Sequence, residues 1–424
     1  MFGYHGRYLR VDGQNERTGC VPLPERVLRA FLGGAGLGTW ILSHEPPAGV
    51  DPLGREAALV FALSPLVGSP LTTSAKFAVV AKSPLTNRLC DALSSSHFAI
   101  AAKRVGVDAI VVTGACDQPS ILFVDGLGRE EPVVRWERAE RLWGLSAQEA
   151  ENRIRTRHGN DWQVAAIGPA GERLIPFATL SHDGRHAGRG GLGAVLGSKR
   201  IKAIAVRGDR RTPLADPERT VAIARDLSAR SFGPATEKYR ELGTVANLLV
   251  FNRFEALPTR NFQGGHFPEA PRLASKELAP ARRLARNSCA ACTIGCEHVY
   301  ALPQSGGVRL EYESLFALGP LCGVDDPACV LRAAAACDEA GLDTISTGGT
   351  VAFLMECAER GWIDPRVGPD ERPLRFGDGE ALVAAVEAIV RREGAGELLA
   401  LGSRSAAERI GGAAPRFAPH VKGL

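Results

Sequence analysis

Three cysteines stand within eight residues, in the segment Cys289-Ala-Ala-Cys292-Thr-Ile-Gly-Cys296. Thiolates with these spacings can converge on one metal centre, because the backbone between them is long enough to curl around it and Gly295 gives the curl room. Three ligands are visible and a fourth is needed. His298 is poorly placed to complete a tetrahedral zinc site, since it follows the last cysteine by only two residues. The spacing favours an iron–sulfur cluster and leaves a zinc site or structural thiols as alternatives.

A second candidate is Gly188-Arg-Gly-Gly-Leu-Gly193, which satisfies the G-x-G-x-x-G pattern of pyrophosphate-binding loops. The preceding residues Ser181–Ala187 are polar and do not predict the strand that a Rossmann site requires. A Rossmann site is therefore not expected, but backbone N–H groups beside Arg185 and Arg189 suit another phosphate. A tight turn with surface arginines is the alternative. The similar stretch Gly33–Gly38 follows a predicted helix and is interpreted as a helix cap and turn.

The composition limits the class of protein. A chain of 424 residues with 45% hydrophobic content is long enough for two or three domains with their own cores. The formal net charge of +4 and the lack of Lys/Arg runs give no support for binding to nucleic acid or to a membrane. The N-terminus lacks the layout of a signal peptide, and no window approaches the ~20 apolar residues of a membrane span. We expect a cytoplasmic protein whose ten cysteines are thiols or metal ligands rather than disulfides.

The elements that must position these residues change in kind near residue 210. Before that point, short β-branched or aromatic runs bounded by Gly, Pro or Asp predict strands with few helices between them, which argues against a regular parallel βαβ sheet. After it, the hydrophobic period is that of helices. We predict an α+β protein with a β-rich domain over residues 1–210 and an all-α domain over residues 211–424. The predicted strands are Gly6–Asp12, Ala58–Leu63, Phe77–Ala81, Ala109–Thr113, Ser120–Val124, Val164–Ile167 and Ile201–Val206. The predicted helices are Glu25–Phe31, Ala147–Arg157, Pro217–Ala229, Lys238–Arg253, Pro327–Ala340, Thr350–Arg360, Gly379–Glu393 and Gly396–Ile410.

Further motifs occur in a fixed order along the chain. They are Gly3–Asp12, Val50-Asp-Pro-Leu53, Lys82-Ser-Pro-Leu-Thr86, Val107-Asp-Ala-Ile110, Ile167-Gly-Pro-Ala-Gly-Glu172, Ala187–Lys199, the cysteine segment, Glu311-Tyr-Glu313 and Cys337–Gly348. With these motifs the chain resembles the tungsten-containing aldehyde ferredoxin oxidoreductase family. The long glycine block and the Asp-Glu-Ala-Gly-Leu-Asp block are the specific ones, and the resemblance covers essentially the whole chain.

The resemblance implies an enzyme that oxidises a small aldehyde to a carboxylic acid and passes the electrons to ferredoxin. Family members hold tungsten between two pterins beside a [4Fe–4S] cluster, and molybdenum in place of tungsten stays open here. The β-rich domain would form the base for the pterins, and Cys289, Cys292 and Cys296 would ligate the cluster. Glu313 would relay the proton of an attacking water, although a simple helix-start carboxylate is the alternative. The residues that the resemblance places at the pterins are Lys76, Ser94, Ser95, Arg185, Ala187, Gly188, Arg189, Gly190, Asp338, Leu342 and Asp343.

The chain departs from the family pattern in two loops that would face the pterins. It has Ala75-Lys76-Phe77 where the family usually has Gly-Arg-Phe/Tyr, and Leu93-Ser-Ser-Ser96 where the family has Asn-Ser-Gly-Gly. Lys76 keeps the positive charge but loses the bidentate fork that suits a phosphate. Weakened or altered pterin binding is therefore expected.

The chain also departs from the family in length. Family members continue into a third domain, which carries the cysteine that is the fourth cluster ligand, whereas this chain offers only Cys322, Cys329 and Cys337 nearby. We expect the fourth ligand to lie off this chain, on a second polypeptide or a homodimer partner. Two functions compete: a pterin oxidoreductase, in truncated or split form, and a non-catalytic iron–sulfur or scaffold paralogue of the family.

Overall fold

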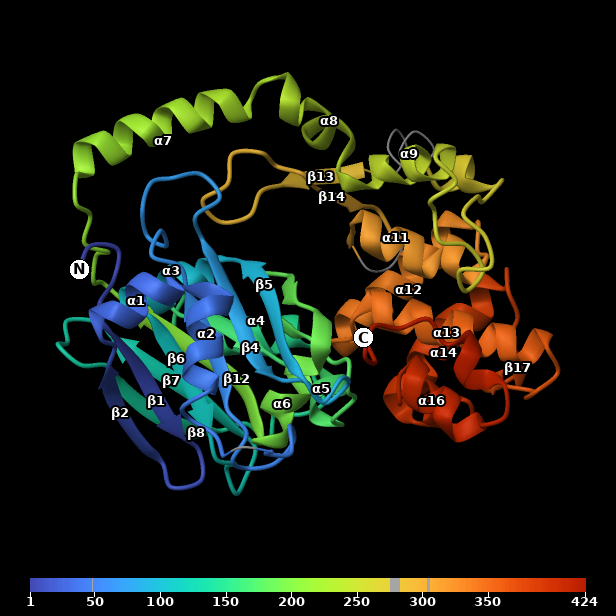
Figure 1. Ribbon diagram of the computed structural model, residues 1–424, viewed down its shortest axis with the longest axis horizontal. Coiled ribbons are helices and arrows are strands. Elements are labelled where there is room, and N and C mark those ends of the chain that lie inside the picture. Colours follow the sequence, from blue (N-terminus) through green and yellow to red (C-terminus); the bar gives the residue numbers. More distant parts are fainter. Residues whose placement is uncertain (48, 275–282, 303–305) are drawn as a thin grey trace. The chain divides into compact units, whose positions relative to one another are not determined.

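A computed structural model describes residues 1–424 with the exception of 48, 275–282 and 303–305 (Figure 1). The chain divides into two compact units. Unit 1 comprises Met1–Ser231 and Cys289–Thr293, and unit 2 comprises Phe232–Ser288 and Ile294–Leu424. Among the described helices, none is long and apolar enough to cross a membrane.

Unit 1 contains two six-stranded sheets. Sheet A has the order β2-β1-β6-β3-β4-β5, in which β1 and β6 run parallel and the other neighbours antiparallel. Sheet B has the order β11-β10-β9-β12-β7-β8, in which β12 and β7 run parallel. The strands are β1 (Arg7–Asp12), β2 (Arg17–Pro22), β3 (Leu59–Leu63), β4 (Lys76–Lys82), β5 (Leu89–Ser95), β6 (Ala109–Thr113), β7 (Ser120–Gly126), β8 (Val133–Arg138), β9 (Gln163–Ala166), β10 (Leu180–His182), β11 (Arg185–Ala187) and β12 (Ile201–Gly208). The mostly antiparallel pairing confirms that this half is not a regular βαβ sheet.

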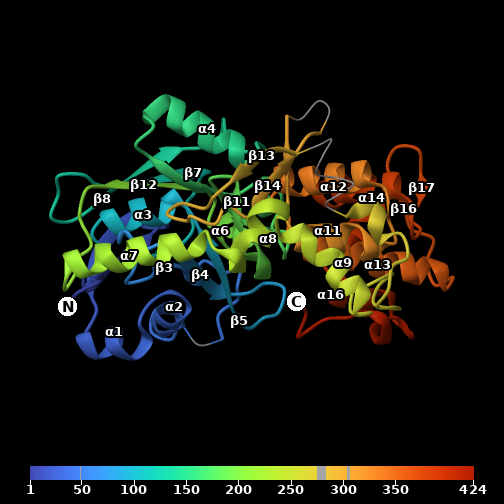
Figure 2. The ribbon, with the colours of Figure 1, turned by 90° about the horizontal axis from the view of Figure 1, so that it is seen from above.

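Most helices of unit 1 pack on or between the sheets. The helices of the unit are α1 (Glu25–Phe31), α2 (Gly34–Leu42), α3 (His97–Arg104), α4 (Ala147–His158), α5 (Pro169–Glu172), α6 (Leu192–Ser198) and α7 (Pro217–Ser231), with a 3-10 turn η1 (Arg189–Gly191). Helices α3 and α6 contact strands of both sheets, and one large apolar core, which includes the packed rings of Phe61, Phe77 and Phe98, fills the space around them. Helices α1 and α2 cover the other face of sheet A, while α4 covers the other face of sheet B (Figure 2).

The interpretation of Gly33–Gly38 as a cap and turn is wrong, because most of this stretch forms the start of α2. The helix packs on sheet A so closely that a Cβ atom at Gly38 would lie 2.5 Å from Cγ2 of Val80. A Cβ atom at Gly36 would lie 2.5 Å from the carbonyl oxygen of Phe31. These glycines therefore allow close packing rather than reverse the chain.

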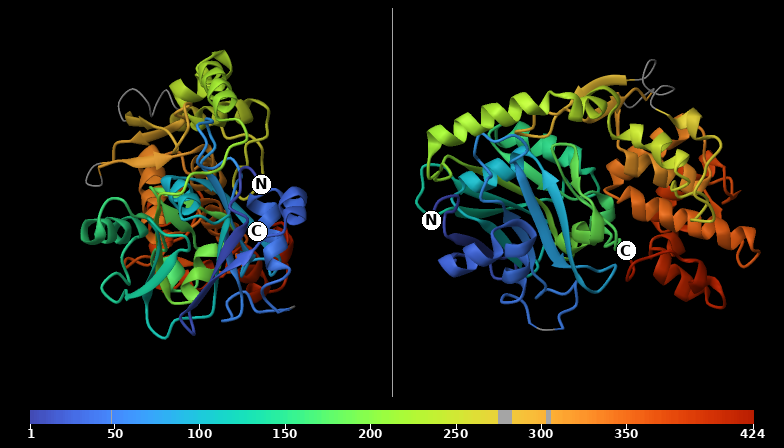
Figure 3. Two further views of the ribbon diagram at one scale, coloured as in Figure 1. Left: turned by 90° about the vertical axis from the view of Figure 1, so that its left-hand side faces the viewer. Right: turned by 45° about the horizontal axis from the view of Figure 1, so that its top comes forward.

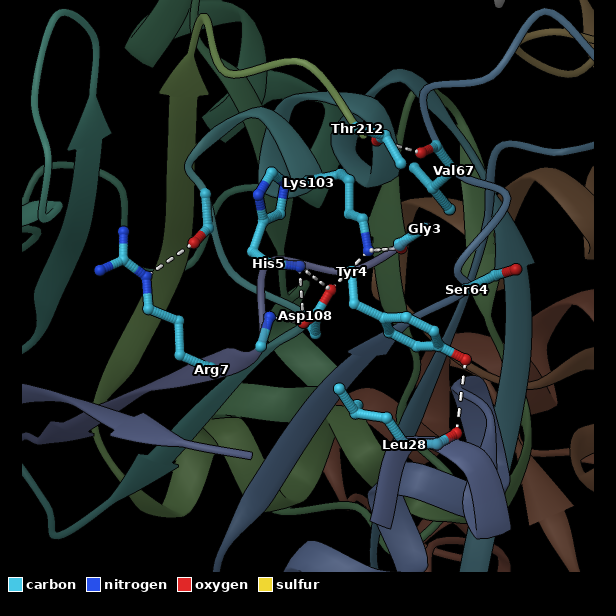
Figure 4. A network of polar contacts seen from close by, with 12 residues as sticks. Gly3, Tyr4, His5, Arg7, Leu28, Ser64, Val67, Lys103, Asp108 and Thr212 are labelled. Atoms are coloured by element: carbon cyan, nitrogen blue, oxygen red, sulfur yellow. Dashed lines mark hydrogen bonds and ion pairs between the residues drawn. The ribbon is translucent and has the colours of Figure 1, made fainter. Parts of the chain in front are cut away.

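A buried polar network fixes the N-terminal segment of unit 1 (Figure 4). The Lys103 ammonium donates to Asp108 at 2.5 Å and to the carbonyl oxygen of Gly3 at 3.0 Å. Asp108 also accepts from the backbone N–H groups of His5 and Gly6 at 3.0 and 2.7 Å. Burial, reinforced by the Lys103 charge, lowers the pKa of His5 to about 4. Removal of either member of a buried pair of this kind costs about 3–5 kcal/mol, so the network is a structural anchor.

Unit 2 is mainly helical (Figure 3). Its α-helices are α8 (Pro234–Leu242), α9 (Asn247–Arg253), α11 (Tyr312–Leu318), α12 (Pro327–Ala340), α13 (Thr344–Glu359), α14 (Gly379–Arg391), α15 (Gly396–Leu399) and α16 (Ser403–Ile410), with 3-10 turns η2 (Thr244–Ala246), η3 (Ala270–Leu273), η4 (Pro320–Cys322) and η5 (Ala414–Phe417). Helix α13 is buried on most of its surface and contacts α11 and α16. The α+β class is thus confirmed for the chain.

Two features of unit 2 differ from the prediction of an all-α domain. An antiparallel sheet of β13 (Arg283–Asn287), β14 (Glu297–Tyr300) and β15 (Val308–Leu310) is present, as is a two-stranded one of β16 (Arg366–Val367) and β17 (Arg372–Pro373). The single helix predicted over Lys238–Arg253 is interrupted at Gly243, whose φ of 71° is incompatible with a right-handed helix. The segment Gly396–Ile410 is divided in the same way at Gly402, whose φ is 80°.

Candidate functional site

Two of the predicted pterin residues, Lys76 and Ser95, meet at one end of the β4–β5 pair. Lys76 begins β4 and Ser95 ends β5, and the two are directly opposite in the sheet register. The Lys76 ammonium donates to the Ser95 hydroxyl oxygen at 2.9 Å. One departure from the family pattern in each of the two loops therefore contacts the other, so the serine orients the lysine that stands in place of an arginine.

Ser94 faces the other side of the same sheet. Side chains alternate along a strand, and Phe77 and Val79 of β4 lie in the core between the sheets whereas Ala78 and Val80 lie under α2. Lys76 shares the face of Ala78 and Val80, and Ser94 points toward sheet B. Its hydroxyl donates to the carbonyl oxygen of His186 in β11 at 3.3 Å. Lys76 and Ser94 therefore lie on opposite faces of sheet A.

The segment Arg185–Gly190 runs along the edge strand β5. His186 lies near Ser94 at one end of β5, and its Nδ1 atom lies 2.8 Å from the Ser181 hydroxyl. Gly190 lies against Cys90 near the other end, where a Cβ atom on Gly190 would come within 2.2 Å of the cysteine sulfur. The predicted residues of this segment are therefore brought beside Ser94, but they are spread over the length of a strand.

Gly188 and Gly190 of this segment differ in whether the fold requires a glycine. Gly190 has a φ of 84° and is buried against β5, so the fold itself requires glycine there. Gly188 has a φ of −86°, and the nearest heavy atom to a Cβ at this position would be Cβ of His186 at 4.0 Å. Arg185 and Arg189 are half-buried and Ala187 is buried. The open backbone at Gly188, between two arginines, is the part of the glycine motif that packing leaves unexplained.

The cysteine segment is the connection between β13 and β14. The N–H of Cys292 donates to the carbonyl oxygen of Cys289 at 3.0 Å, and Ala291 has a φ of 52°, so these two cysteines share one tight turn. Gly295 has a φ of 67°, which agrees with its predicted part in the curl. All three cysteines of the segment are half-exposed.

The turn of the cysteine segment is held on unit 1 by hydrogen bonds to the residues just before β4. The Thr73 N–H donates to the carbonyl oxygen of Ala291 at 2.5 Å, and the Thr293 N–H donates to the Thr72 hydroxyl oxygen at 3.1 Å. The hydroxyl oxygens of Thr72 and Thr293 lie 2.8 Å apart. Thr72 and Thr73 precede Lys76 by four and three residues. The turn with Cys289 and Cys292 is thereby fixed beside the end of β4 at which Lys76 lies.

The thiols considered as a fourth ligand are enclosed in unit 2. Cys322 and Cys337 are fully buried and Cys329 is 4% exposed. Burial raises the pKa of each thiol, that of Cys329 to about 11. The Cys322 thiol donates to the carbonyl oxygen of Ala317 at 3.4 Å. Protonated, enclosed thiols are poor candidates for a cluster ligand.

Within the described ranges of the chain, no three His, Cys, Asp or Glu side chains are gathered in a way that could hold a metal ion. The donor set of the cysteine segment nevertheless fits an iron–sulfur cluster by type, since Cys289 and Cys292 share a turn and remain accessible. The ligand roles of Cys289, Cys292 and Cys296 stay a prediction.

In unit 2 the residues of the Asp338–Asp343 motif form the junction of two helices. Gly341 ends α12 with a φ of 76°, and Leu342 is 2% exposed in the core. Asp343 caps α13, because its carboxylate accepts from the backbone N–H groups of Ile345 and Ser346 at 3.3 and 3.1 Å. The fold accounts for Leu342 and Asp343 without a ligand, and Asp338 lies half-buried near the end of α12. The pterin contacts of Asp338, Leu342 and Asp343 stay a prediction.

The predicted catalytic residue, Glu313, is exposed in the first turn of α11. Its neighbour Glu311 is more enclosed and accepts a hydrogen bond from the Thr244 hydroxyl at 2.7 Å. Burial raises the pKa of Glu311, the direction expected of a carboxyl group that stores a proton. No sequence pattern assigns a role to Glu311, because its burial directly after β15 is visible only in the fold.

Comparison with known proteins identifies the family. The family model of the aldehyde ferredoxin oxidoreductase N-terminal domain matches residues 8–208, and the family model of domains 2 and 3 matches residues 224–424. The chain belongs to the aldehyde ferredoxin oxidoreductase family. It is 39% identical over 417 residues to the tungsten-containing aldehyde ferredoxin oxidoreductase of Pyrococcus furiosus, which covers 97% of this chain and 68% of that protein. The protein of the same description from Thermococcus kodakarensis is 39% identical over 431 residues, with coverage of 100% and 70%.

Proteins with other names are also similar to this chain. The aliphatic sulfonate oxidoreductase, WOR-like subunit, of Pyrococcus furiosus is 31% identical over 455 residues, which covers 100% of this chain and 71% of that protein. Among solved structures, the active-site complex BamBC of benzoyl coenzyme A reductase with 1,5-dienoyl-CoA matches with a TM-score of 0.86 at 25% identity. That match covers 100% of this chain and 66% of the other. The fold is therefore shared by proteins named for different substrates.

Proposed function

We propose that this chain is a tungsten or molybdenum pterin oxidoreductase, which oxidises a small aldehyde to a carboxylic acid and passes the electrons through a [4Fe–4S] cluster to ferredoxin. Membership of the family supports an oxidoreductase, and the names of two similar proteins include tungsten and ferredoxin. The observation that carries the proposal is the position of the cysteine turn, which is hydrogen-bonded to Thr72 and Thr73 immediately before Lys76.

Residues spread along β4 and β5 fit a phosphate-bearing cofactor. Lys76 at the strand end and the two arginines Arg185 and Arg189 on the segment beside β5 supply positive charge, and the open backbone at Gly188 allows close approach of a phosphate. The hydrogen bond from Lys76 to Ser95 orients a single ammonium rather than a planar fork. A phosphate held by this chain would therefore depend more on charge than on bidentate geometry.

When bound, the pterin metal supplies a two-electron acceptor and the cluster a one-electron exit. This chain's own residues would hold the groups and move the proton. Cys289, Cys292 and Cys296 would hold the cluster. Glu313, which is exposed, would accept the proton of the water that attacks the aldehyde, and Glu311 would be the more enclosed reserve for that proton.

The proposal is tested by anaerobic preparation of the protein, followed by analysis of iron, sulfide, tungsten, molybdenum and pterin. Preparations that contain pterin and one of the two metals should reduce a viologen dye when a short aliphatic or aromatic aldehyde is added. The product should be the corresponding carboxylic acid.

The same measurements of metals, sulfide and pterin distinguish the proposed function from the alternative one. Iron and sulfide without pterin would contradict the oxidoreductase proposal and favour the iron–sulfur or scaffold paralogue. Stoichiometric zinc without iron would overturn both, because the cysteine segment would then hold a different metal.

A further inference from the structure

A cavity of about 490 Å³ lies on the side of sheet B that α4 covers. Its walls come from β7, from β8 and the loop that follows it, and from the second half of α4. Three apolar side chains contribute to its lining, namely Ile121, Leu142 and Ile154. A cavity of this size, partly apolar, is typical of sites for small organic molecules.

The remaining lining is charged and mainly positive. Four arginines and two glutamates face the cavity, which leaves an excess of two positive charges if His158 is neutral. The arginines are Arg138, Arg141, Arg153 and Arg157, and the glutamates are Glu137 and Glu140. An apolar surface surrounded by positive charge complements a molecule with an apolar body and an acidic group.

The ion pairs of this rim leave one arginine for a ligand. Arg138 pairs with Glu140 at 3.1 Å, and Arg157 pairs with Glu137 at 2.9 Å. Arg153 pairs with Glu149, one turn away on α4, at 2.5 Å. Arg141 forms no ion pair with any residue in the part of the chain that the structure describes. Its guanidinium group can therefore form a bidentate pair with a carboxylate or phosphate without first breaking an existing pair.

The existing ion pairs of the rim compete only weakly with an anionic ligand for the arginines. The side chains of Arg138 and Arg157 are 77% and 71% exposed, and exposed ion pairs contribute about 0–1 kcal/mol. Such pairs exchange partners readily. An anion bound at Arg141 can therefore also pair with Arg138 or Arg157, because breaking their exposed ion pairs costs little free energy.

We propose that this cavity binds a small organic anion, whose apolar body rests on Ile121, Leu142 and Ile154 and whose carboxylate or phosphate group pairs with Arg141. The site is separate from the groups assigned to the pterins, because none of its lining residues belongs to that set and they come from β7, β8, the loop after β8 and α4 rather than from β4, β5 or β11. The proposal does not depend on the proposed function.

The test is isothermal titration calorimetry of the full, anaerobically prepared chain with three probes of one shape: 2-naphthoate, 2-naphthyl phosphate and the neutral 2-naphthalenemethanol. At least one anion should bind saturably, and the neutral probe should bind about tenfold more weakly, because it lacks the charged partner of Arg141. The tighter of the two anions identifies the acidic group that the site prefers.

The variants Arg141→Ala and Arg141→Glu should weaken anion binding by about fivefold and by at least about tenfold, respectively. Arg129→Ala is the matched control, since Arg129 is an exposed arginine in the β7–β8 connection and does not line the cavity. It should leave the affinity unchanged. Equal affinity for the neutral probe, or unaltered anion binding in Arg141→Glu, would overturn the proposal. Iron and pterin contents, measured in the same samples, should be equal in all variants, which keeps this test distinct from that of the oxidoreductase function.

Discussion

In unit 1 the thiols of Cys289 and Cys292 lie on a half-exposed turn, whereas in unit 2 the thiols of Cys322 and Cys337 are enclosed by helices. Burial raises the pKa of the enclosed pair, so that both stay protonated at neutral pH. Metal ions bind thiolates, not thiols. The same residue type is therefore available for chemistry in one unit and serves as core in the other.

Charged and polar residues show the same contrast. Lys76 of unit 1 is half-buried at a strand end and bonded only to the Ser95 hydroxyl among the contacts described for it. Asp343 of unit 2 already accepts two backbone hydrogen bonds and one from the Ser346 hydroxyl. A motif residue whose hydrogen bonds are used by the fold is a weaker indication of ligand binding than one whose bonds are not.

The largest effect is expected at the cysteines. Cys292→Ser should reduce the iron and sulfide content of the anaerobically prepared protein to background, because a hydroxyl is a poor ligand in a thiolate cluster. Cys337→Ser should keep its iron but lose about 1–3 kcal/mol of stability, since it buries a hydroxyl group in an apolar site. Iron analysis and urea unfolding measure the two quantities. Loss of iron in Cys337→Ser alone would reverse the assignment.

A large effect is also expected at one glycine of unit 1. Gly190→Ala should cost about 2–4 kcal/mol, because its Cβ would clash with the Cys90 sulfur and its φ is positive. Gly188→Ala should fold normally, since its Cβ would meet nothing closer than 4.0 Å. It should nevertheless lower pterin occupancy if the open backbone receives a phosphate. Thermal unfolding and pterin analysis compare the two variants, and full pterin content in Gly188→Ala would show that the loop is only a turn.

A moderate effect is expected at the helix cap of unit 2. Asp343→Ala should cost about 1 kcal/mol, the usual value of an N-cap side chain, while Asp343→Asn should cost much less because asparagine also caps helices. If the fold is the whole purpose of Asp343, pterin content should be normal in Asp343→Asn. Loss of pterin in a stable Asp343→Asn protein would instead reveal a second role for the carboxylate. Unfolding curves and pterin analysis, made on the same preparations, decide between the two.

The smallest effect on the fold is expected at Lys76. Lys76→Met removes the charge and the hydrogen bond to Ser95 but keeps the aliphatic stem, so the stability should change by less than about 1 kcal/mol. Pterin occupancy should fall. Lys76→Arg should keep or raise it, because a guanidinium group binds a phosphate at two points. Unchanged occupancy in Lys76→Met would remove Lys76 from the site.

The hydrophobic patterns of the sequence predicted most of the regular elements. The helix over Pro327–Ala340 agrees with α12 at both ends, and the strand over Ala109–Thr113 agrees with β6. Strand β5 was missed because its sequence, Leu-Cys-Asp-Ala-Leu-Ser-Ser, has no β-branched or aromatic residue and four of its side chains are partly or fully exposed. Its pairing with β4 supplies what its own composition lacks.

The site was predictable only in part. The spacing of the cysteines and the glycine motif could be read from the sequence, since each is local. The hydrogen bonds that link Thr72 and Thr73 with the cysteine turn join residues more than 200 positions apart, and no local pattern signals them. Ser94 and Ser95 point to opposite faces of sheet A because they are neighbours on β5. Since β5 was not predicted, the different directions of the two side chains could not be predicted either.

The segment Cys289–Thr293 also has a consequence for biosynthesis. Unit 1 is discontinuous, because its last five residues are supplied after the chain has passed through Phe232–Ser288. During translation the two sheets can form as soon as Ser231 has emerged, but the loop before β4 acquires its partners Ala291 and Thr293 only some 60 residues later. At about 5–20 residues per second, that interval lasts for several seconds. During this interval Thr72 and Thr73 lack these hydrogen-bond partners. The end of β4 that carries Lys76 is therefore the last part of unit 1 to be completed on the ribosome.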